Sequence, residues 1–312
     1  MNVEVFYRFF PVFRLKLKKI LGLSMTGELA EVVSVPKTMG KTGVKDLAEV
    51  TRHTFEGVLL DEFNEGLYTT EIDGFNYDFF WKPKKSTQDR LFVLFSGDAL
   101  RSKNDPPVFQ RWSWADHFPG HVVYFSDPSL YLSPKLGLAW YAGTKNHDPM
   151  VNIAEILGKI CTQLDLDSNQ LVSYGSSGGG FAALRLGLFL PEISTICINP
   201  QVDITKYGKN LVERYLRTCL ELEDRAEALE LYPDRINLIE NIDKLAKNRI
   251  IYVQNVLDED HYEIHFKLFR DALTTSSEYS DKRFSEVFFS HGEGHKAAET
   301  TEAFNKAISL LS

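Results

Sequence analysis

The sequence contains only three cysteines, Cys161, Cys197 and Cys219, and they are far apart in the chain. Zinc and redox motifs need cysteines within a few residues of each other, so neither kind of site is predicted. An odd number of isolated thiols also gives no basis for a disulfide framework. We therefore expect reduced, structural cysteines in a protein of a reducing compartment.

Long apolar runs are missing as well. Between residues 6 and 23, aromatic and aliphatic side chains are interrupted by five basic ones, Arg8, Arg14, Lys16, Lys18 and Lys19. The cations break every apolar stretch, so the segment is neither a secretory signal core nor a membrane span, which takes about 20 apolar residues. We expect a cytoplasmic protein whose segment 6–23 either packs on its own domain or contacts an anionic membrane surface peripherally.

Concentrated positive charge is also scarce, because 35 Lys and Arg residues are outnumbered by 43 Asp and Glu residues, for a net charge of −8. Nucleic-acid binding needs a dense basic surface that neutralises phosphates, so no nucleic-acid partner is expected. The chain has no Pro-, Gly- or Ser-rich linker tract and no internal repeat. With 44% hydrophobic residues over 312 positions, it is typical of a globular protein with one large α/β domain or two small ones.

The sequence does contain a regular alternation of strand-like and helix-like segments. Two short apolar runs, 67–72 and 77–81, flank Asp73-Gly74 and predict an antiparallel hairpin. The other predicted strands are 91–95, 121–125, 171–174, 195–198, 250–253 and 287–289, and the predicted helices are 152–164, 181–190, 261–274 and 296–311. This alternation predicts an α/β protein with a mostly parallel sheet and helices on both faces.

The most informative motif is Gly175-Ser176-Ser177-Gly178-Gly179, which joins the predicted strand 171–174 to the predicted helix 181–190. In a Gly-x-Ser-x-Gly turn of this kind, the serine adopts a strained backbone that lifts its hydroxyl clear of the sheet edge. Ser177 is that serine. Two other interpretations are a glycine-rich turn without chemistry and a phosphate-binding loop, although no Lys-Ser/Thr pair follows the glycines as it does in a P-loop.

A serine nucleophile needs a base that takes its proton and a carboxylate that orients the base. His295 is the preferred base because it lies just after the last predicted strand, and His291, four residues earlier, is its competitor. Asp258 is the preferred acid because it lies closest to the end of strand 250–253, with Asp260 as the alternative.

A histidine pair, His261 and His265, has the i, i+4 spacing of a metal-binding pair on a helix. No Glu stands between them in the position that the metalloprotease pattern requires. We therefore expect surface or core histidines, and no metal or other cofactor.

The order of these residues resembles that of the α/β-hydrolase superfamily. With the hairpin counted as the first two strands, Ser177 follows the fifth strand, Asp258 the seventh and His295 the eighth, which is the family's order of nucleophile, acid and base. The resemblance runs from about residue 67 to residue 312. It implies an oxyanion hole built from the backbone N–H of Gly178 and a second N–H, of Asp98 or Gly97, in the loop after the third strand.

The resemblance also implies a division of the chain into an N-terminal arm, residues 1–60, and an α/β-hydrolase domain, residues 61–312. Residues 203–247 exceed the length of a simple crossover, and hydrolases of this fold usually carry a helical lid there; extra helical packing is the other interpretation. Trp140, Tyr141 and Gln201 follow predicted strand ends and are candidate pocket residues.

These patterns predict a serine carboxylesterase that works through an acyl-enzyme on a small-molecule or glycan ester. The runs Gly-Ser-Ser-Gly-Gly-Gly-Phe-Ala-Ala-Leu and Asn255-x-x-Asp258-x-x-His261 also resemble O-acetyltransferases and esterases of bacterial surface glycans. An O-acyltransferase acting on a glycan precursor is therefore the alternative, and a non-catalytic scaffold of the same fold is the third possibility. The oligomeric state is not predicted.

Overall fold

The computed structural model describes Leu47 and residues 50–84, 90–297 and 299–311. The basic apolar segment 6–23 lies outside these described residues, so the hypothesis of a peripheral membrane contact stays a prediction. Within the described part of the chain, no helix is both long and apolar enough to cross a membrane.

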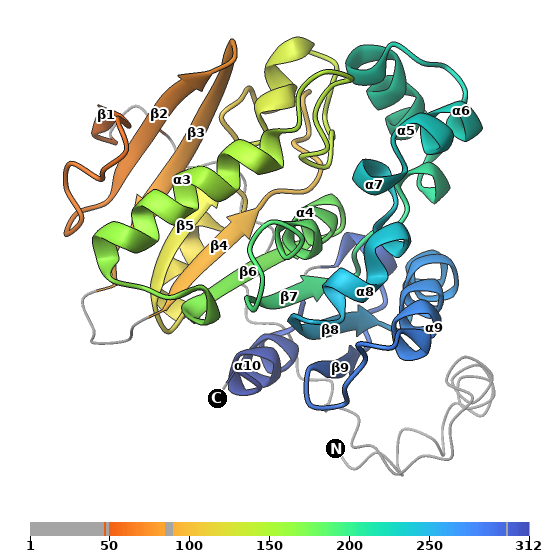
Figure 1. Ribbon diagram of the computed structural model, residues 1–312. Helices are drawn as coiled ribbons and strands as arrows, with labels where there is room; N and C mark the ends of the chain where they lie inside the picture. Colours follow the sequence, from red (N-terminus) through yellow and green to blue (C-terminus); the bar gives the residue numbers. More distant parts are fainter. Residues whose placement is uncertain (1–46, 48–49, 85–89, 298, 312) are drawn as a thin grey trace.

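The described residues form one nine-stranded sheet in the order β1-β2-β3-β5-β4-β6-β7-β8-β9 (Figure 1). The strands are β1 (Arg52–Thr54), β2 (Gly66–Ile72), β3 (Phe75–Lys82), β4 (Leu91–Phe95), β5 (His121–Phe125), β6 (Leu171–Ser176), β7 (Ser194–Ile198), β8 (Arg249–Asn255) and β9 (Phe284–Phe289). From β5 to β9 across the sheet, neighbouring strands are parallel, whereas β3 is antiparallel to both β2 and β5. The mostly parallel α/β sheet and its leading hairpin are confirmed.

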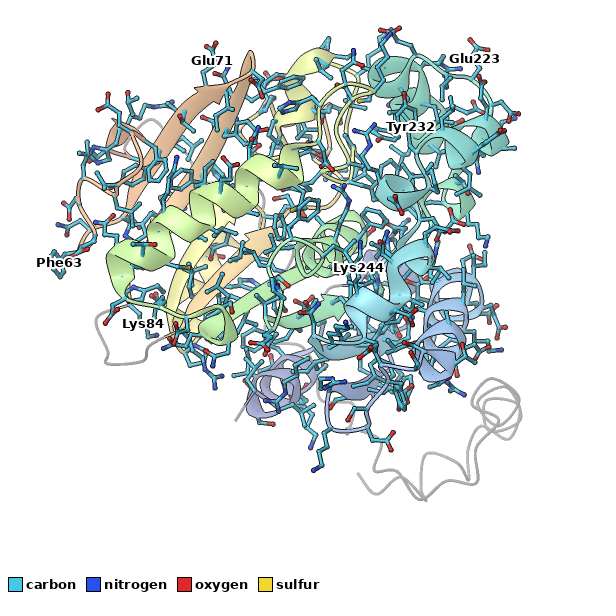
Figure 2. The ribbon with its side chains drawn as sticks, in the orientation of Figure 1. Phe63, Glu71, Lys84, Glu223, Tyr232 and Lys244 are labelled. Carbon is cyan, nitrogen blue, oxygen red and sulfur yellow. The ribbon has the colours of Figure 1, made fainter. Side chains whose placement is uncertain are left out.

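Strand β1 was not predicted. Its three residues pair in parallel with β2, at the edge of the sheet. Phe55 and Leu59, which follow it, are buried in the core, whereas Phe63 is 75% exposed and projects from the next loop (Figure 2). The boundary proposed at residue 60 is a prediction, and residues on its N-terminal side pack on the sheet.

Helices cover both faces of the sheet (Figure 1). The helices that pack against it are α3 (Pro149–Leu164), α4 (Gly178–Leu186), α9 (Lys267–Thr275) and α10 (Thr301–Ser309). The first three cover one face and α10 covers the other. Strand side chains alternate accordingly, so Leu91 and Val93 of β4 face α3, whereas Phe92 and Leu94 lie in the cluster that contains Phe304 of α10.

The segment between β7 and β8, residues 203–247, is here called the insertion. It contains α5 (Lys209–Tyr215), α6 (Arg225–Leu231), α7 (Pro233–Ile236) and α8 (Ile242–Leu245). Tyr215 and Leu216 are fully buried, in one apolar cluster with Phe181 of α4 and Trp140. Its outer surface is polar, and Glu223 points away from the body of the molecule (Figure 2).

All three cysteines are free and buried. Cys161 lies in α3, Cys197 lies in β7, and Cys219 lies in the insertion, directly after α5. The expectation of isolated, structural thiols agrees with these positions.

Candidate active site

Ser177 lies at a tight turn between β6 and α4. Its φ of 54° and ψ of −123° lie outside the ordinary regions for a residue with a side chain. The chain reverses so closely that a Cβ on Gly175 would lie 2.1 Å from the carbonyl oxygen of Gly179, and a Cβ on Gly179 would lie 2.4 Å from that of Phe95. Small residues at both positions are therefore a steric requirement of the turn, as the sequence motif predicted.

Gly175→Ala should lower the free energy of unfolding by about 2–4 kcal/mol, because the methyl group would collide with rigid backbone. Gly158→Ala is the matched control, since Gly158 is an exposed residue inside α3 whose added Cβ would have no atom within 4 Å. That change should raise stability by about 0.5–1 kcal/mol. Urea denaturation of both variants measures the difference, and equal effects would contradict the steric argument.

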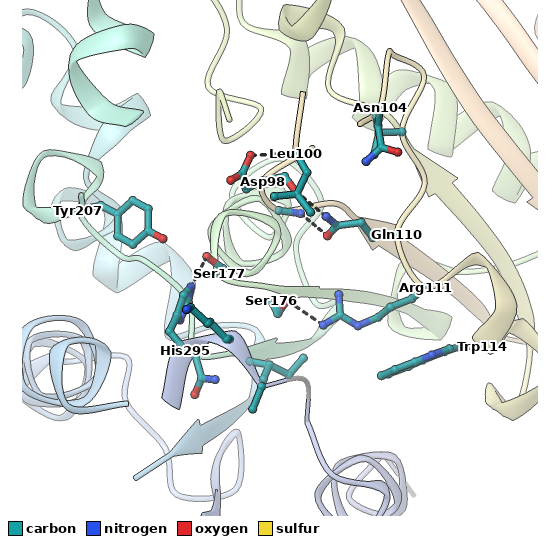
Figure 3. A pocket seen from close by; sticks show the side chains of 16 residues that line it. Asp98, Leu100, Asn104, Gln110, Arg111, Trp114, Ser176, Ser177, Tyr207 and His295 are labelled. Atoms are coloured by element: carbon teal, nitrogen blue, oxygen red, sulfur yellow. Dashed lines mark hydrogen bonds between the residues drawn. The ribbon is translucent and has the colours of Figure 1, made fainter. Parts of the chain in front are cut away.

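Ser177, His295 and Asp258 lie within hydrogen-bond reach of one another at the carboxyl ends of β6, β9 and β8. The Oγ of Ser177 is 2.9 Å from Nε2 of His295 (Figure 3). The Nδ1 of His295 is 2.7 Å from Oδ2 of Asp258. The alternatives lie elsewhere: Asp260 is exposed, and the ring of His291 accepts a hydrogen bond from the backbone N–H of Glu293.

Asn255, the last residue of β8, holds the loop that carries His295. Its Nδ2 donates to the carbonyl oxygens of His291 and Gly294, and its Oδ1 accepts from the backbone N–H of His291. Asn255 is fully buried, so these hydrogen bonds are protected from competition with water. Its position at a strand end was visible in the sequence, but its partners 36 to 39 residues away were not.

Asp258 is buried and accepts hydrogen bonds from two histidines. Oδ2 faces His295, and Oδ1 is 3.1 Å from Nδ1 of His261. Burial acts to raise the pKa of Asp258, but the hydrogen bonds from His261 and His295 outweigh burial and hold the pKa well below its usual range. The carboxylate therefore stays ionised whenever the protein is folded near neutral pH.

Asp258→Asn should lower turnover by about 10⁴-fold, because an amide donor facing His295 would favour the wrong imidazole tautomer. The change also alters acid stability. The folded-state pKa of Asp258 is depressed, so its stabilising contribution is present above the unfolded pKa of about 3.9 and is lost as the pH falls below it. Unfolding of the variant should therefore depend less on pH than that of the wild type between roughly pH 4 and pH 2. Asp260→Asn is the control, and a comparable loss of turnover there would favour the alternative acid.

Gln201 and His261 complete the surroundings of Ser177. The Nε2 of Gln201 is 2.9 Å from Ser177 Oγ and 2.7 Å from Nε2 of His261. Both side chains are buried. The sequence predicts Gln201 as a pocket residue and His261 as a surface or core residue. It predicts neither the contact of Gln201 with Ser177 nor that of His261 with Asp258.

Trp140 and Tyr141 are fully buried behind the site. Trp140 Nε1 donates to Gln201 Oε1 at 3.0 Å, and the Tyr141 hydroxyl donates to the carbonyl oxygen of Phe125. Among the described residues that line the pocket beside Ser177, neither aromatic residue is included. The two aromatic residues are candidate pocket residues by their sequence position, but in the structure they are part of the core and support the site from behind.

The loop after β4 lies beside Ser177, and its residues Gly97 and Asp98 line the same pocket as the serine. Gly97 donates its N–H to Oε1 of Gln110 at 2.9 Å, and Nε2 of Gln110 donates to the carbonyl oxygen of Asp98 at 2.7 Å. The N–H of Gly97 is therefore engaged, which makes Asp98 the better of the two predicted donors. Gly178 is the first residue of α4, a position whose N–H has no acceptor within the helix.

A pocket of about 250 Å³ opens beside Ser177 (Figure 3). Its lining includes Gly97, Asp98, Leu100, Gln110, Arg111, Trp114, Tyr207 and His295. Arg111 forms a salt bridge of 3.0 Å with Glu299 and donates to Ser176 Oγ at 2.8 Å. Tyr207, from the insertion, points its hydroxyl toward Ser177 (Figure 3); burial raises the pKa of Tyr207, and a hydrogen bond with Ser177 partly offsets that effect.

One group among the described residues has the geometry of a possible metal site. Ligand atoms of Asp258, His261 and His295 lie within 4.8 Å of one another. The same carboxylate oxygens and ring nitrogens are engaged in the hydrogen bonds above, so binding an ion would first require breaking them. The expectation that no metal takes part stays a prediction.

The chain matches no protein-family model and no curated protein. It is similar in structure to the capsule O-acetyltransferase of Neisseria meningitidis serogroup A, with a TM-score of 0.54 and 19% identity over 78% of this chain and 92% of that chain. A mutant of that enzyme in complex with CoA is similar to the same extent. Dipeptidyl peptidase 4 of Porphyromonas gingivalis has a TM-score of 0.58 and 15% identity, over 79% of this chain but 35% of the peptidase.

Proposed function

We propose that this chain is a serine-dependent acyl-transfer enzyme with Ser177 as nucleophile, His295 as base and Asp258 as orienting acid. The chain has the α/β-hydrolase fold, and its structural neighbours include an O-acetyltransferase, a dipeptidyl peptidase and a hydrolase. The observation that carries this proposal is the unbroken hydrogen-bond path from Ser177 through His295 to Asp258, with distances of 2.9 and 2.7 Å. A serine at a strained elbow with a base and acid in line is an activated nucleophile.

In the first half of the reaction, Ser177 Oγ bonds to an acyl carbonyl carbon while its proton passes to His295 Nε2. The negative charge on the carbonyl oxygen is held by the backbone N–H groups of Gly178 and Asp98. The bond to the leaving group then breaks, and the leaving group takes the proton from His295. In the second half, water or an acceptor hydroxyl gives its proton to His295 and attacks the ester, and Ser177 recovers its proton as the acyl group departs.

A second candidate is O-acetyl transfer to a glycan hydroxyl. This chain accounts for 92% of the length of the capsule O-acetyltransferase but for 35% of the peptidase, so it is nearer in size and organisation to the transferase. CoA bound to the transferase mutant points to an acyl thioester as the donor to try first. A pocket of about 250 Å³ suits a short acyl group better than a long one.

Intact mass after treatment with a fluorophosphonate tests the activated serine. The wild type should gain one adduct and Ser177→Ala none. Acetyl-CoA and p-nitrophenyl acetate are then supplied with and without a capsule-type glycan. Acceptor-dependent loss of acetyl donor would support the transferase, and equal turnover without acceptor would support the esterase. No adduct on folded wild type would contradict both and leave the non-catalytic scaffold.

A further inference from the structure

A second histidine lies against the predicted catalytic histidine. The rings of His261 and His295 are stacked, with centroids 3.8 Å apart and planes 5° from parallel. Both donate toward the same carboxylate, His295 to Oδ2 of Asp258 and His261 to Oδ1. His261 is 3% exposed. Its ring nitrogens therefore form hydrogen bonds with protein groups rather than with solvent.

The orientation of the Gln201 amide follows from Trp140. An indole N–H can only donate, so the Gln201 atom that faces Trp140 Nε1 at 3.0 Å must be the oxygen. The amide nitrogen then faces the other way, toward Ser177 Oγ at 2.9 Å and His261 Nε2 at 2.7 Å. Its two N–H groups are thereby assigned one to each partner.

The tautomer of His261 follows in turn. Because Gln201 donates to Nε2, that nitrogen must carry a lone pair, and the ring proton must lie on Nδ1, where it is donated to Asp258. His261 is therefore neutral. A charged ring would place a second cation 3.8 Å from the ring of His295, which becomes an imidazolium when it takes the proton of the serine.

These hydrogen bonds form a closed ring. One path runs from Asp258 through His295 to Ser177, and the other runs from Asp258 through His261 and Gln201 to the same oxygen. Since Ser177 Oγ accepts from Gln201, the hydroxyl proton does not point at the amide, and His295 Nε2 lies 2.9 Å away to receive it. The second path therefore orients the proton for transfer along the first.

We propose that Gln201 is a further catalytic residue that donates to Ser177 Oγ, and that His261 is a positioning residue that fixes Gln201 and Asp258. The inference rests on the proposed function of Ser177. Gln201 stabilises the oxygen as negative charge develops on it during attack, and again when that oxygen leaves in the breakdown of the acyl-enzyme. His261 touches neither substrate nor the serine and acts through the other two residues.

The kinetic test compares rates of fluorophosphonate inactivation and the kcat and KM for p-nitrophenyl acetate. Gln201→Met removes the donor and should slow inactivation and kcat by about 10- to 100-fold, with KM changed by less than about threefold. His261→Asn keeps a donor near the Nδ1 position but loses the contact with Gln201, and should cost about 3- to 10-fold. The double variant should be no more than about twofold slower than Gln201→Met, because both changes interrupt one path.

Gln163→Met is the matched control. Gln163, near the end of α3, is a half-buried glutamine that bonds the backbone N–H and carbonyl of Leu59 and the carboxylate of Glu62. Its loss removes as many hydrogen bonds as that of Gln201, far from the serine, and should leave inactivation within about twofold of wild type. If Gln201→Met also stays within about twofold, or if its effect and that of His261→Asn multiply fully, the inference is overturned.

Ring-nitrogen NMR of the wild type tests the same network without activity. At pH 7 the signals of His261, assigned by their loss in His261→Asn, should show a proton on Nδ1 and none on Nε2. A proton on Nε2 would mean that the Gln201 amide is reversed and would overturn the inference even if Gln201→Met does not fold. A wild type that gives no adduct would instead refute the proposed function, and with it the catalytic part of the role of Gln201.

Discussion

Ser177→Ala should lower the rate of acyl turnover by about 10⁶-fold, because no other group at the elbow replaces its oxygen. The neighbouring Ser176 is not a substitute, since its Oγ accepts a hydrogen bond of 2.8 Å from Arg111 and lies one residue before the turn. Alanine adopts the same backbone angles as serine, so the fold should be unchanged. Turnover of p-nitrophenyl acetate, measured beside the thermal midpoint of unfolding, checks both statements.

Ser176→Ala is the control for this change. It removes a hydroxyl from the same pocket and leaves Arg111 paired with Glu299, so its turnover should fall by about tenfold at most. If the two variants lost activity equally, the result would contradict the assignment of Ser177, rather than Ser176, as the nucleophile. A wild-type rate in Ser177→Ala would remove the serine mechanism altogether.

His295→Ala should have an effect of the same size, about 10⁶-fold, because the serine loses the group that takes its proton. His261 is the residue that most resembles a replacement, since it also bonds Asp258. Its Nε2, however, is 2.7 Å from Gln201 Nε2 and accepts a hydrogen bond from that amide, so it does not face the serine oxygen as a base. Residual turnover in His295→Ala should therefore come only from binding and the oxyanion donors.

His291→Ala separates the two histidines of the loop. Among the described residues, the ring of His291 bonds only the backbone of Glu293, two residues further on, whereas the loop is held through the backbone of His291 by Asn255. Alanine preserves those backbone groups, so turnover should stay within about threefold of wild type. A large loss in His291→Ala, with normal turnover in His295→Ala, would reverse the assignment of the base.

The fold was predictable because its signals are local. Each of the eight strands from β2 to β9 contains an apolar run between turn residues, and the elbow motif lies between one strand and one helix. The sequence does not predict β1, because Arg-His-Thr has no apolar pattern and the strand is stabilised by pairing with β2. Helix ends were less accurate: the last helix was predicted from residue 296, but Thr300 caps it and α10 begins at Thr301.

The candidate site was predictable only in part, for the same physical reason. Ser177, Asp258 and His295 each follow a strand, so chain order alone indicated that they would meet at one edge of the sheet. The second hydrogen-bond path, from Asp258 through His261 and Gln201 to Ser177, depends on contacts between residues about 60 positions apart, which leave no periodic signal in the sequence. The three-residue spacing of Asp258 and His261 is the one part of this path that the sequence shows.

The rates at which the buried cysteines react with a thiol reagent can show whether the insertion moves. Burial raises the pKa of Cys161 to about 11, and it raises the pKa of Cys197 and Cys219 as well, so none of them reacts readily while covered. Cys219 is covered by the insertion itself, whereas Cys197 is inside the central sheet. If the insertion opens for substrate as a lid does, a thiol reagent should modify Cys219 well before Cys197. If the insertion is fixed packing, the two should react together, at the pace of global unfolding.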